Sequence, residues 1–496
     1  MPFRNVDFKK PEFKKLTDVE WEISTSFKQG MRVPVKVYSS QSLLNKMDLE
    51  VFDQAANAAM FPGLLKYSYV FSDGHSGYGV PVGWCGAFDL KEGIISPGAI
   101  GFDINCGMRV IKTNLTLDEI KPKVKEIVDL LFKMVPAGVG ATSYQEPKEI
   151  TKIPEGTFRE IVEEGVKWAT DNGYAWKDDL SRIEEYGGVE TADFSKVSKS
   201  AYSRGKNQIG TLGSGNHYLE IQAIDKIFDE ETAKQWGLGI VDNQICIMIH
   251  CGSRGFGHQI CTDYLDSFLS AMTKYKINVP DRQLACAPFD SEEGQNYLKA
   301  MSCAINFAFI NRQFIVYQIR KAFEKVLNKS AEDLGMEIIY DVAHNTAKLE
   351  EHQLNGKKAK VIVHRKGATR SFGPGHPELA PMFQKSGQPV IVGGSMETGS
   401  FLCVGTKKAE EETFGTTLHG SGRTMSRTKA KKMIRGDELQ KQMLERGIYV
   451  KATTMIGLAE EAGFAYKDIN EVVDSMHAAG ISSKVLRLRP VANIKG

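Results

Sequence analysis

Short glycine-containing turns that also carry histidine, asparagine, serine or arginine recur along this chain from residue 73 to residue 495. The chain has 47 glycines among 496 residues, above the usual share of about 7%. Glycine is costly in conformational entropy, so a surplus indicates places where the backbone turns sharply or approaches a ligand closely. Because no linker-like tract separates these turns, we expect them to build one site within a single cooperative domain over residues 1–496.

Buried strands are predicted where short apolar runs lead into these turns. Strand candidates lie at 245–249, 337–340, 359–363 and 389–392, with further strands and tight turns between 67 and 110. Helices are expected at 49–60 and 294–326, and a peripheral helical section at 115–200 contains amphipathic segments at 160–168 and 178–186. We therefore predict a mixed α/β (α+β) fold, a single large domain with a central two-sheet β core, helices outside and the site at the strand ends.

The overall charge gives no sign of a nucleic-acid partner. Lys and Arg number 63 against 61 Asp and Glu, a formal net charge of +2. The near-zero net charge arises because an acidic section around 155–190 offsets basic stretches at 357–370 and 423–435. We expect the basic stretches to contact any phosphate-rich partner.

Membrane and disulfide-scaffold classes are excluded by the distribution of residues. No uncharged stretch approaches the roughly 20 residues that a membrane span needs, and residues 1–7 lack the apolar region of a signal peptide. The eight cysteines contain no CxxC pair, which fits neither a disulfide scaffold nor a zinc ribbon. We expect a cytoplasmic protein without a membrane partner.

A metal site is predicted from residues that follow apolar runs. Asp103 and Cys106 lie three apart in a turn, so a carboxylate oxygen and a thiolate can face one cation; the alternative is a turn aspartate and a buried structural cysteine. His217, His250 and His344 each lie at a strand-to-turn junction. Three such junctions favour metal binding over separate structural histidines, and we predict a pair of metals that share the Cys106 thiolate. Softness of the ligands alone favours zinc or cobalt.

A phosphate site is predicted at two further turns. Gly213 and Gly215 precede Asn216 and His217, an arrangement that lets backbone approach phosphate, although an ordinary hairpin turn is the alternative. The second turn, 419–423, contains a histidine between small residues and then Ser421, Gly422 and Arg423 at a predicted helix start. His419 is a candidate ligand, general base or nucleophile that attacks phosphorus, and a helix cap with a solvated basic face is the alternative.

These motifs together resemble the RtcB family of RNA-splicing ligases. The matching segments are 73–75, 77–79, 103–107, 213–217, 250–255, 344–345, 365–370, 419–423 and 494–496, in order along nearly the whole chain. The resemblance implies an RtcB-like fold and a GTP-dependent ligase that joins RNA 2′,3′-cyclic phosphate or 3′-phosphate ends to 5′-hydroxyl ends, in tRNA splicing and RNA repair.

The resemblance also implies roles for individual residues. His419 would attack the α-phosphorus of GTP to form a guanylyl-histidine, and the guanylyl group would then pass to the RNA 3′-phosphate. Two Mn²⁺ ions would bind at Asp103, Cys106 and His217, and at Cys106, His250 and His344. Contacts to GTP or GMP would come from Asn216, His217, Tyr218, Leu219, Glu220, His344, Asn345, Gly393, Gly394, Ser395, Met396, Ser400, His419, Gly420, Ser421, Gly422 and Lys495. Orienting or RNA-phosphate contacts would come from Asp73, Arg204, Arg254, Lys366, Arg423 and Tyr466, with Asp73 holding the His419 imidazole.

Two other functions fit the same residues. A dinuclear metal phosphatase or cyclic phosphodiesterase acting on RNA ends would need the metals and no nucleotide. An RNA-binding scaffold would need neither. The physiological RNA, the need for an activating protein partner and the oligomeric state stay open at this point.

Overall fold

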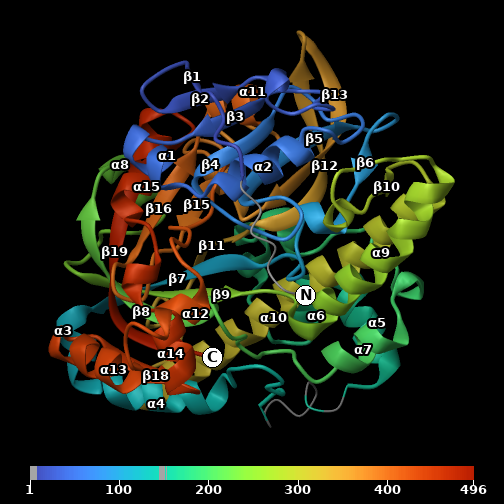
Figure 1. Cartoon of the computed structure of the whole chain (residues 1–496). Coiled ribbons are helices and arrows are strands. Elements are labelled where there is room, and N and C mark those ends of the chain that lie inside the picture. The colour runs from blue at the N-terminus through green and yellow to red at the C-terminus, as the bar shows by residue number, and fades with distance from the viewer. Residues whose placement is uncertain (1–7, 145–150, 152) are drawn as a thin grey trace.

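The computed structural model describes residues 8–144, 151 and 153–496, in which the strands form two large sheets and two small ones. The N-terminal segment 1–7, where we expect no signal peptide, lies outside the described residues. In Figure 1 most of the seven-stranded sheet lies at the top of the view, and the eight-stranded sheet lies below it.

The upper, seven-stranded sheet has the order β1-β2-β3-β4-β5-β13-β12. Its strands are β1 (Lys14–Lys15), β2 (Glu20–Ile23), β3 (Val35–Tyr38), β4 (Ser68–His75), β5 (Val82–Asp89), β12 (Asn345–Leu354) and β13 (Lys357–Lys366). All neighbouring strands are antiparallel except β3 and β4.

The lower, eight-stranded sheet has the order β11-β7-β9-β8-β19-β16-β15, and β18 pairs in parallel with β19. Its strands are β7 (Gly107–Thr116), β8 (Tyr218–Ile227), β9 (Gln244–Cys251), β11 (Ile338–Ala343), β15 (Pro389–Val392), β16 (Ser400–Gly405), β18 (Tyr449–Ala452) and β19 (Ser482–Lys495). The two-stranded sheets pair β6 (Ile94–Ile95) with β10 (Ala287–Pro288), and β14 (Ala368–Arg370) with β17 (Thr416–Leu418).

The two large sheets pack against each other through an apolar layer. Phe71 and Val363 from the upper sheet belong to the same buried cluster as Val392 and Phe401 from the lower sheet. The predicted mixed α/β fold with a two-sheet core is confirmed. The four predicted strands correspond to β9, β11, β13 and β15.

Helices cover the sheets and fill the space beside them (Figure 1). They are α1 (Gln41–Lys46), α2 (Leu49–Ala58), α3 (Leu117–Ile120), α4 (Val124–Met134), α5 (Glu155–Glu164), α6 (Val166–Asp171), α7 (Lys199–Gly205), α8 (Glu230–Gln235), α9 (Arg254–Lys274), α10 (Glu292–Leu327), α11 (Lys407–Thr413), α12 (Arg427–Ala430), α13 (Gly436–Glu445), α14 (Met455–Glu460) and α15 (Ile469–Ala478). Among the described residues, no helix is both long enough and apolar enough to cross a membrane.

The longest helix, α10, lies inside the molecule. Ser291 caps its N-terminus by accepting a hydrogen bond from the Gly294 amide, and it ends at Asn328, which takes the left-handed conformation (φ 54°) that commonly closes a helix. Residues 300–316 are all buried, so this stretch packs on every side. Buried polar residues on α10 must therefore find partners within the protein.

Three local predictions are wrong. The segment 160–168 breaks at Gly165 (φ 65°) between α5 and α6. The segment 178–186 forms short 3₁₀ turns, because Glu185 and Tyr186 have positive φ angles of 56° and 52°. Within the basic stretch 423–435, the α-helix covers Arg427–Ala430 only.

The basic stretch 357–370 does not form a continuous basic surface. Arg365 is buried and forms a bidentate ion pair with Glu350, with Nη2 2.9 Å from Oε2. Arg370 is also buried and donates to Glu185 Oε1 at 2.7 Å. Their charges are neutralised inside the protein, so the expectation that they meet a phosphate-rich partner is wrong.

Candidate active site

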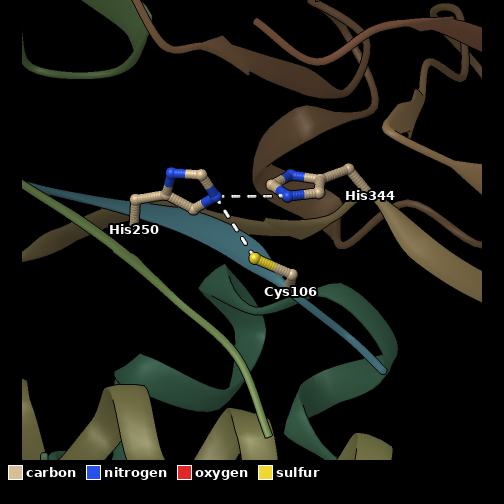
Figure 2. Close-up of side chains that lie close together, drawn as sticks. All are labelled: Cys106, His250 and His344. Carbon is tan, nitrogen blue, oxygen red and sulfur yellow. Dashed lines mark hydrogen bonds between the residues drawn. The ribbon is translucent and has the colours of Figure 1, made fainter. Parts of the chain in front are cut away.

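Cys106 lies at the centre of a group of side chains of the types that can bind a metal ion. Its Sγ is 3.4 Å from His217 Nε2 and 3.3 Å from His250 Nε2. His250 Nε2 is 3.2 Å from His344 Nε2, and Figure 2 shows these two rings and the thiol pointing toward one another. Asp103 Oδ2 is 2.8 Å from His217 Nε2. The ligand atoms fall into two sets, Asp103/Cys106/His217 and Cys106/His250/His344, each within 4.8 Å.

Strand register brings these side chains together. β11, β7, β9 and β8 are consecutive neighbours in the lower sheet. Gly107 pairs with Ala343, so Cys106 and His344 both lie just beyond the same end of the sheet. Tyr218 pairs with His250, which places His217 beside His250. The amide of His344 donates to the Cys106 carbonyl at 2.8 Å and closes the junction.

The protonation states of His250, His344 and Asp103 suit a cation. Burial holds the pKa of His250 and of His344 well below the usual value, so both imidazoles are neutral and have a lone pair to offer. Burial alone would raise the pKa of Asp103, but His217 lowers it to about 2. Burial raises the pKa of the Cys106 thiol to about 12, so a thiolate here needs a nearby cation.

The residues present therefore fit a pair of transition-metal ions. The Nε2 atoms of His217 and His250 both lie within 3.4 Å of Cys106 Sγ, and His344 Nε2 lies 3.2 Å from His250 Nε2. A buried cluster of this kind is costly unless a cation satisfies the converging lone pairs.

A second pair of side chains, Asp73 and His419, lies next to this cluster. Asp73 Oδ2 is 2.7 Å from His419 Nδ1 and also accepts from the backbone amides of His419 and Gly420 at 3.0 and 3.3 Å. Burial alone would raise the pKa of Asp73, but the hydrogen bonds and charge of His419 lower it. Because Nδ1 faces the carboxylate, Nε2 is the ring nitrogen left for a reaction. The His419 and His344 rings are 4.7 Å apart between centroids.

Asp73 is fully buried next to His419. One cavity of about 430 Å³ is lined by His419 and by four residues of the Cys106 cluster: Asp103, Cys106, His250 and His344. Its other predicted site residues are Asn216, Tyr218, Asn345, Lys366, Gly393, Gly394, Ser395, Met396, Gly420, Ser421, Gly422, Arg423, Tyr466 and Lys495. An adjoining cavity of about 890 Å³ is lined by His217, Arg204 and Arg254. Asp103, Asn216 and Arg427 border both cavities, so the two form one continuous cleft.

Three of the predicted GTP contacts are buried and do not line this cavity: Leu219, Glu220 and Ser400. Glu220 is buried in β8, where it accepts hydrogen bonds from Gln222 Nε2 at 2.6 Å and from Asn493 Nδ2. Burial raises the pKa of Glu220 to about 7. Both carboxylate oxygens of Glu220 are therefore occupied by hydrogen bonds inside the protein.

The penultimate residue, Lys495, is part of the site. Strand β19 pairs Lys495 with Tyr218, and Lys495 Nζ donates to the Gly215 carbonyl at 3.2 Å. Burial lowers its pKa. A lysine so near a chain end is usually mobile, and only the family resemblance predicted a role for it.

The four predicted cations take different positions. Arg254 Nη2 donates to the Gly138 carbonyl at 2.9 Å, and Arg204 Nη1 donates to Gln259 Oε1 at 2.9 Å. Lys366 Nζ is buried and donates to the Gly98 carbonyl at 3.0 Å. Arg423 Nη1 donates to the Tyr466 hydroxyl at 3.1 Å.

Sequence reasoning missed two lining residues, Glu461 and His75. Glu461 lines the cavity and pairs with Arg423 and Arg427 at 3.3 and 2.8 Å, which offsets part of the basic character of this rim. His75 also lines the cavity, and burial lowers its pKa to about 4. Its position at the end of β4, two residues from Asp73, was the available signal. No local pattern pointed to Glu461, which follows a short helix.

Comparison with known proteins shows relatives over nearly the full length. A family model described as tRNA-splicing ligase RtcB matches residues 54–496. The tRNA-splicing ligase RtcB of Archaeoglobus fulgidus is 50% identical over 483 residues, which cover 97% of this chain and 98% of that protein. The protein of the same description from Thermococcus kodakarensis is 50% identical over 484 residues, with 97% and 98% covered. The chain belongs to the RtcB family.

A relative with a related description comes from another organism. RNA-splicing ligase RtcB homolog 1 of Entamoeba dispar is 46% identical over 491 residues, which cover 96% of this chain and 90% of that protein. The family predicted from the motifs is confirmed, and with it the predicted class of enzyme, a ligase.

Proposed function

We propose that this chain is a GTP- and Mn²⁺-dependent RNA ligase that joins 2′,3′-cyclic phosphate or 3′-phosphate ends to 5′-hydroxyl ends. The observation that supports this most is the Asp73–His419 pair, because its histidine lines the same cavity as Cys106, His250 and His344. A histidine held by a carboxylate on one nitrogen has its other nitrogen free to attack an electrophile.

In the proposed reaction, His419 Nε2 attacks the α-phosphorus of GTP. A nitrogen–phosphorus bond forms, the bond to the β-phosphate oxygen breaks and pyrophosphate leaves. Asp73 accepts the Nδ1 hydrogen bond throughout and stabilises the positive charge that develops on the ring. Water opens a 2′,3′-cyclic phosphate end to a 3′-phosphate. The guanylyl group then passes to this 3′-phosphate as the bond between His419 nitrogen and phosphorus breaks, and the RNA 5′-hydroxyl displaces GMP to form the new phosphodiester.

We assign Asp103, Cys106 and His217 as ligands of one metal ion, and Cys106, His250 and His344 as ligands of the other. Divalent ions bound there would stabilise negative charge on phosphoryl oxygens. The family resemblance favours Mn²⁺, whereas softness of the ligands favours zinc or cobalt, so metal identity is part of the proposal.

Nucleotide and RNA contacts follow from the two parts of the cleft. Glu220 and Lys495 would meet the guanine, and the glycines at 393, 394, 420 and 422 leave room for the nucleotide against the backbone. Arg204 and Arg254 line the adjoining cavity, where an RNA backbone would pass. We propose a cytoplasmic location on the sequence features given above.

An end-joining assay tests the proposal. We expect purified protein with Mn²⁺ to join an RNA bearing a 2′,3′-cyclic phosphate to one bearing a 5′-hydroxyl only when GTP is present, and the His419→Ala variant to join none. A metal phosphodiesterase would instead open the cyclic phosphate without GTP and keep that activity in His419→Ala. An RNA-binding scaffold would show no turnover and would bind RNA equally well after Cys106→Ala.

A further inference from the structure

A buried arginine on α10, Arg312, lies beneath the Cys106 cluster and makes four side-chain hydrogen bonds. Its Nε and Nη2 donate to the two oxygens of Asp341 at 2.7 and 2.8 Å. Its Nη1 donates to the carbonyls of Asn105 and Cys251, both at 2.8 Å. The side chain is 0% exposed, as is that of Asp341.

The partners of Arg312 are neighbours of three proposed metal ligands. Asn105 precedes Cys106, Cys251 follows His250, and Asp341 lies in β11 three residues before His344. Asn105 also has a left-handed backbone (φ 53°), so its carbonyl direction depends on local hydrogen bonds. A single guanidinium therefore joins the three strand ends from which these ligands project.

The preceding residue of α10, Asn311, makes the corresponding contacts to the remaining histidine turn. Asn311 Oδ1 accepts from the Thr211 amide at 3.1 Å, and Nδ2 donates to the carbonyls of Thr211 and Gly252 at 3.1 Å. Thr211 opens the turn that reaches His217, and Gly252 follows the β9 strand end. The amide thus ties the His217 turn to the His250 strand.

We propose that Arg312 is a positioning residue for the metal centre and that Asn311 positions the His217 turn in the same way. The inference rests on the proposed function, because it assumes that the Cys106 cluster binds metal. The planar guanidinium fork matches a carboxylate and two carbonyls at once, which a lysine ammonium cannot do. Because α10 is rigid and buried here, these bonds fix the spacing of the ligands before metal arrives.

The α10 helix offers a matched control, Arg320. It is also buried, donates to both oxygens of Asp179 at 2.8 and 2.9 Å and donates to the Met336 carbonyl at 3.0 Å. None of these partners adjoins a proposed ligand. Arg312→Lys and Arg320→Lys therefore remove similar buried hydrogen bonds. Only Arg312→Lys removes hydrogen bonds to residues next to the proposed metal ligands.

The test measures Mn²⁺ affinity by chelator competition, without GTP or RNA, together with the melting temperature of the metal-free protein. We expect both variants to lower the melting temperature, and Arg312→Lys alone to weaken Mn²⁺ binding, by about 10- to 100-fold. Equal Mn²⁺ affinity in wild type and Arg312→Lys would overturn the inference. Failure of the wild type to bind Mn²⁺ would instead overturn the proposed metal centre on which it rests.

If Arg312→Lys does not fold, the milder variant Asn311→Ser tests the same inference. It removes the amide that joins Thr211 to Gly252 and leaves the Arg312 bonds in place. We expect it to weaken one of two Mn²⁺ sites, the one that contains His217, by about tenfold or more. Two sites of unchanged affinity in Asn311→Ser would contradict the role of α10 in positioning the ligands.

Discussion

At the scale of single residues, the orientation of His419 depends on one carboxylate. Asp73 accepts from the ring Nδ1 and from two backbone amides of the same turn, so it fixes both the tautomer and the position of the imidazole. Its complete burial makes these bonds strong, since water cannot compete for them.

Asp73→Asn is expected to slow the guanylylation of His419 by about 10²- to 10⁴-fold, because an amide holds the wrong tautomer and stabilises the developing charge less. Single-turnover incorporation of label from α-labelled GTP measures this rate. Mn²⁺ affinity should stay unchanged, because Asp73 is not a proposed ligand. A guanylylation rate equal to that of wild type would show that Asp73 has no role in orienting the nucleophile.

Cys106 belongs to both sets of candidate ligands, whereas His217 belongs to one. We therefore expect Cys106→Ala to weaken binding of both Mn²⁺ ions and His217→Ala to weaken binding of one. Equilibrium dialysis with metal analysis gives the stoichiometry and affinity of each variant. Loss of a single ion in Cys106→Ala would mean that the two sites do not share the thiolate.

At the scale of elements, glycines in the turns let backbone and functional side chains approach closely. A Cβ on Gly252 would lie 2.4 Å from both carboxylate oxygens of Asp103, and a Cβ on Gly213 would lie 1.8 Å from His217 Nδ1. Each glycine therefore makes room for a proposed ligand from another segment.

Gly252→Ala is expected to displace the Asp103 carboxylate and to weaken Mn²⁺ binding by about tenfold or more, with little change in melting temperature. The obstructing atoms are the end of a flexible side chain, so the fold can adjust. The control is Gly156→Ala in α5, where a Cβ meets no described atom within 4 Å and stability should rise by up to about 1 kcal/mol. Unchanged Mn²⁺ affinity in Gly252→Ala would refute this use of the glycine.

Elements could be predicted where the apolar pattern was strong. The strands at 245–249 and 389–392 and the helix at 294–326 were found because each is buried and bounded by a turn. The helix at 178–186 was wrong because charge alternation imitates an amphipathic face, whereas the ion pairs of Glu184 and Glu185 with Lys348 favour turns there. Local sequence does not reveal such partners.

At the scale of the whole molecule, segments far apart in sequence meet at the site. Asp73 comes from the upper sheet, the Cys106 cluster comes from the lower sheet, and Lys495 comes from the last strand. The motifs predicted many of the side chains that the structure brings together at this cavity. They did not predict the central position of α10 or the buried bonds of Arg312, because a buried arginine has no local signature.

Ion pairs that connect the helical section to the sheets should make stability depend on pH. Burial alone would raise the pKa of Glu185, but Lys348 and Arg370 lower it from 4.5 to about 2. Since the folded pKa is below the unfolded one, the carboxylate stabilises the fold above pH 4.5, and this contribution is lost as pH falls toward 2.

The melting temperature of metal-free protein between pH 5 and pH 3 is therefore expected to fall less steeply in Glu185→Gln than in wild type. Glu164→Gln, at an exposed position of α5, is the control and should follow the wild-type slope. Identical slopes in Glu185→Gln and wild type would show that this carboxylate is not stabilised by the fold.

The measurement that tests the central claim most directly is mass spectrometry of the protein after incubation with GTP and Mn²⁺, with the modified residue mapped. We expect a single guanylyl group on His419, absent without Mn²⁺ and absent in His419→Ala, and removed when RNA with a 3′-phosphate and a 5′-hydroxyl partner is added. An unmodified protein that still joins RNA ends, or a guanylyl group on another residue, would contradict the account.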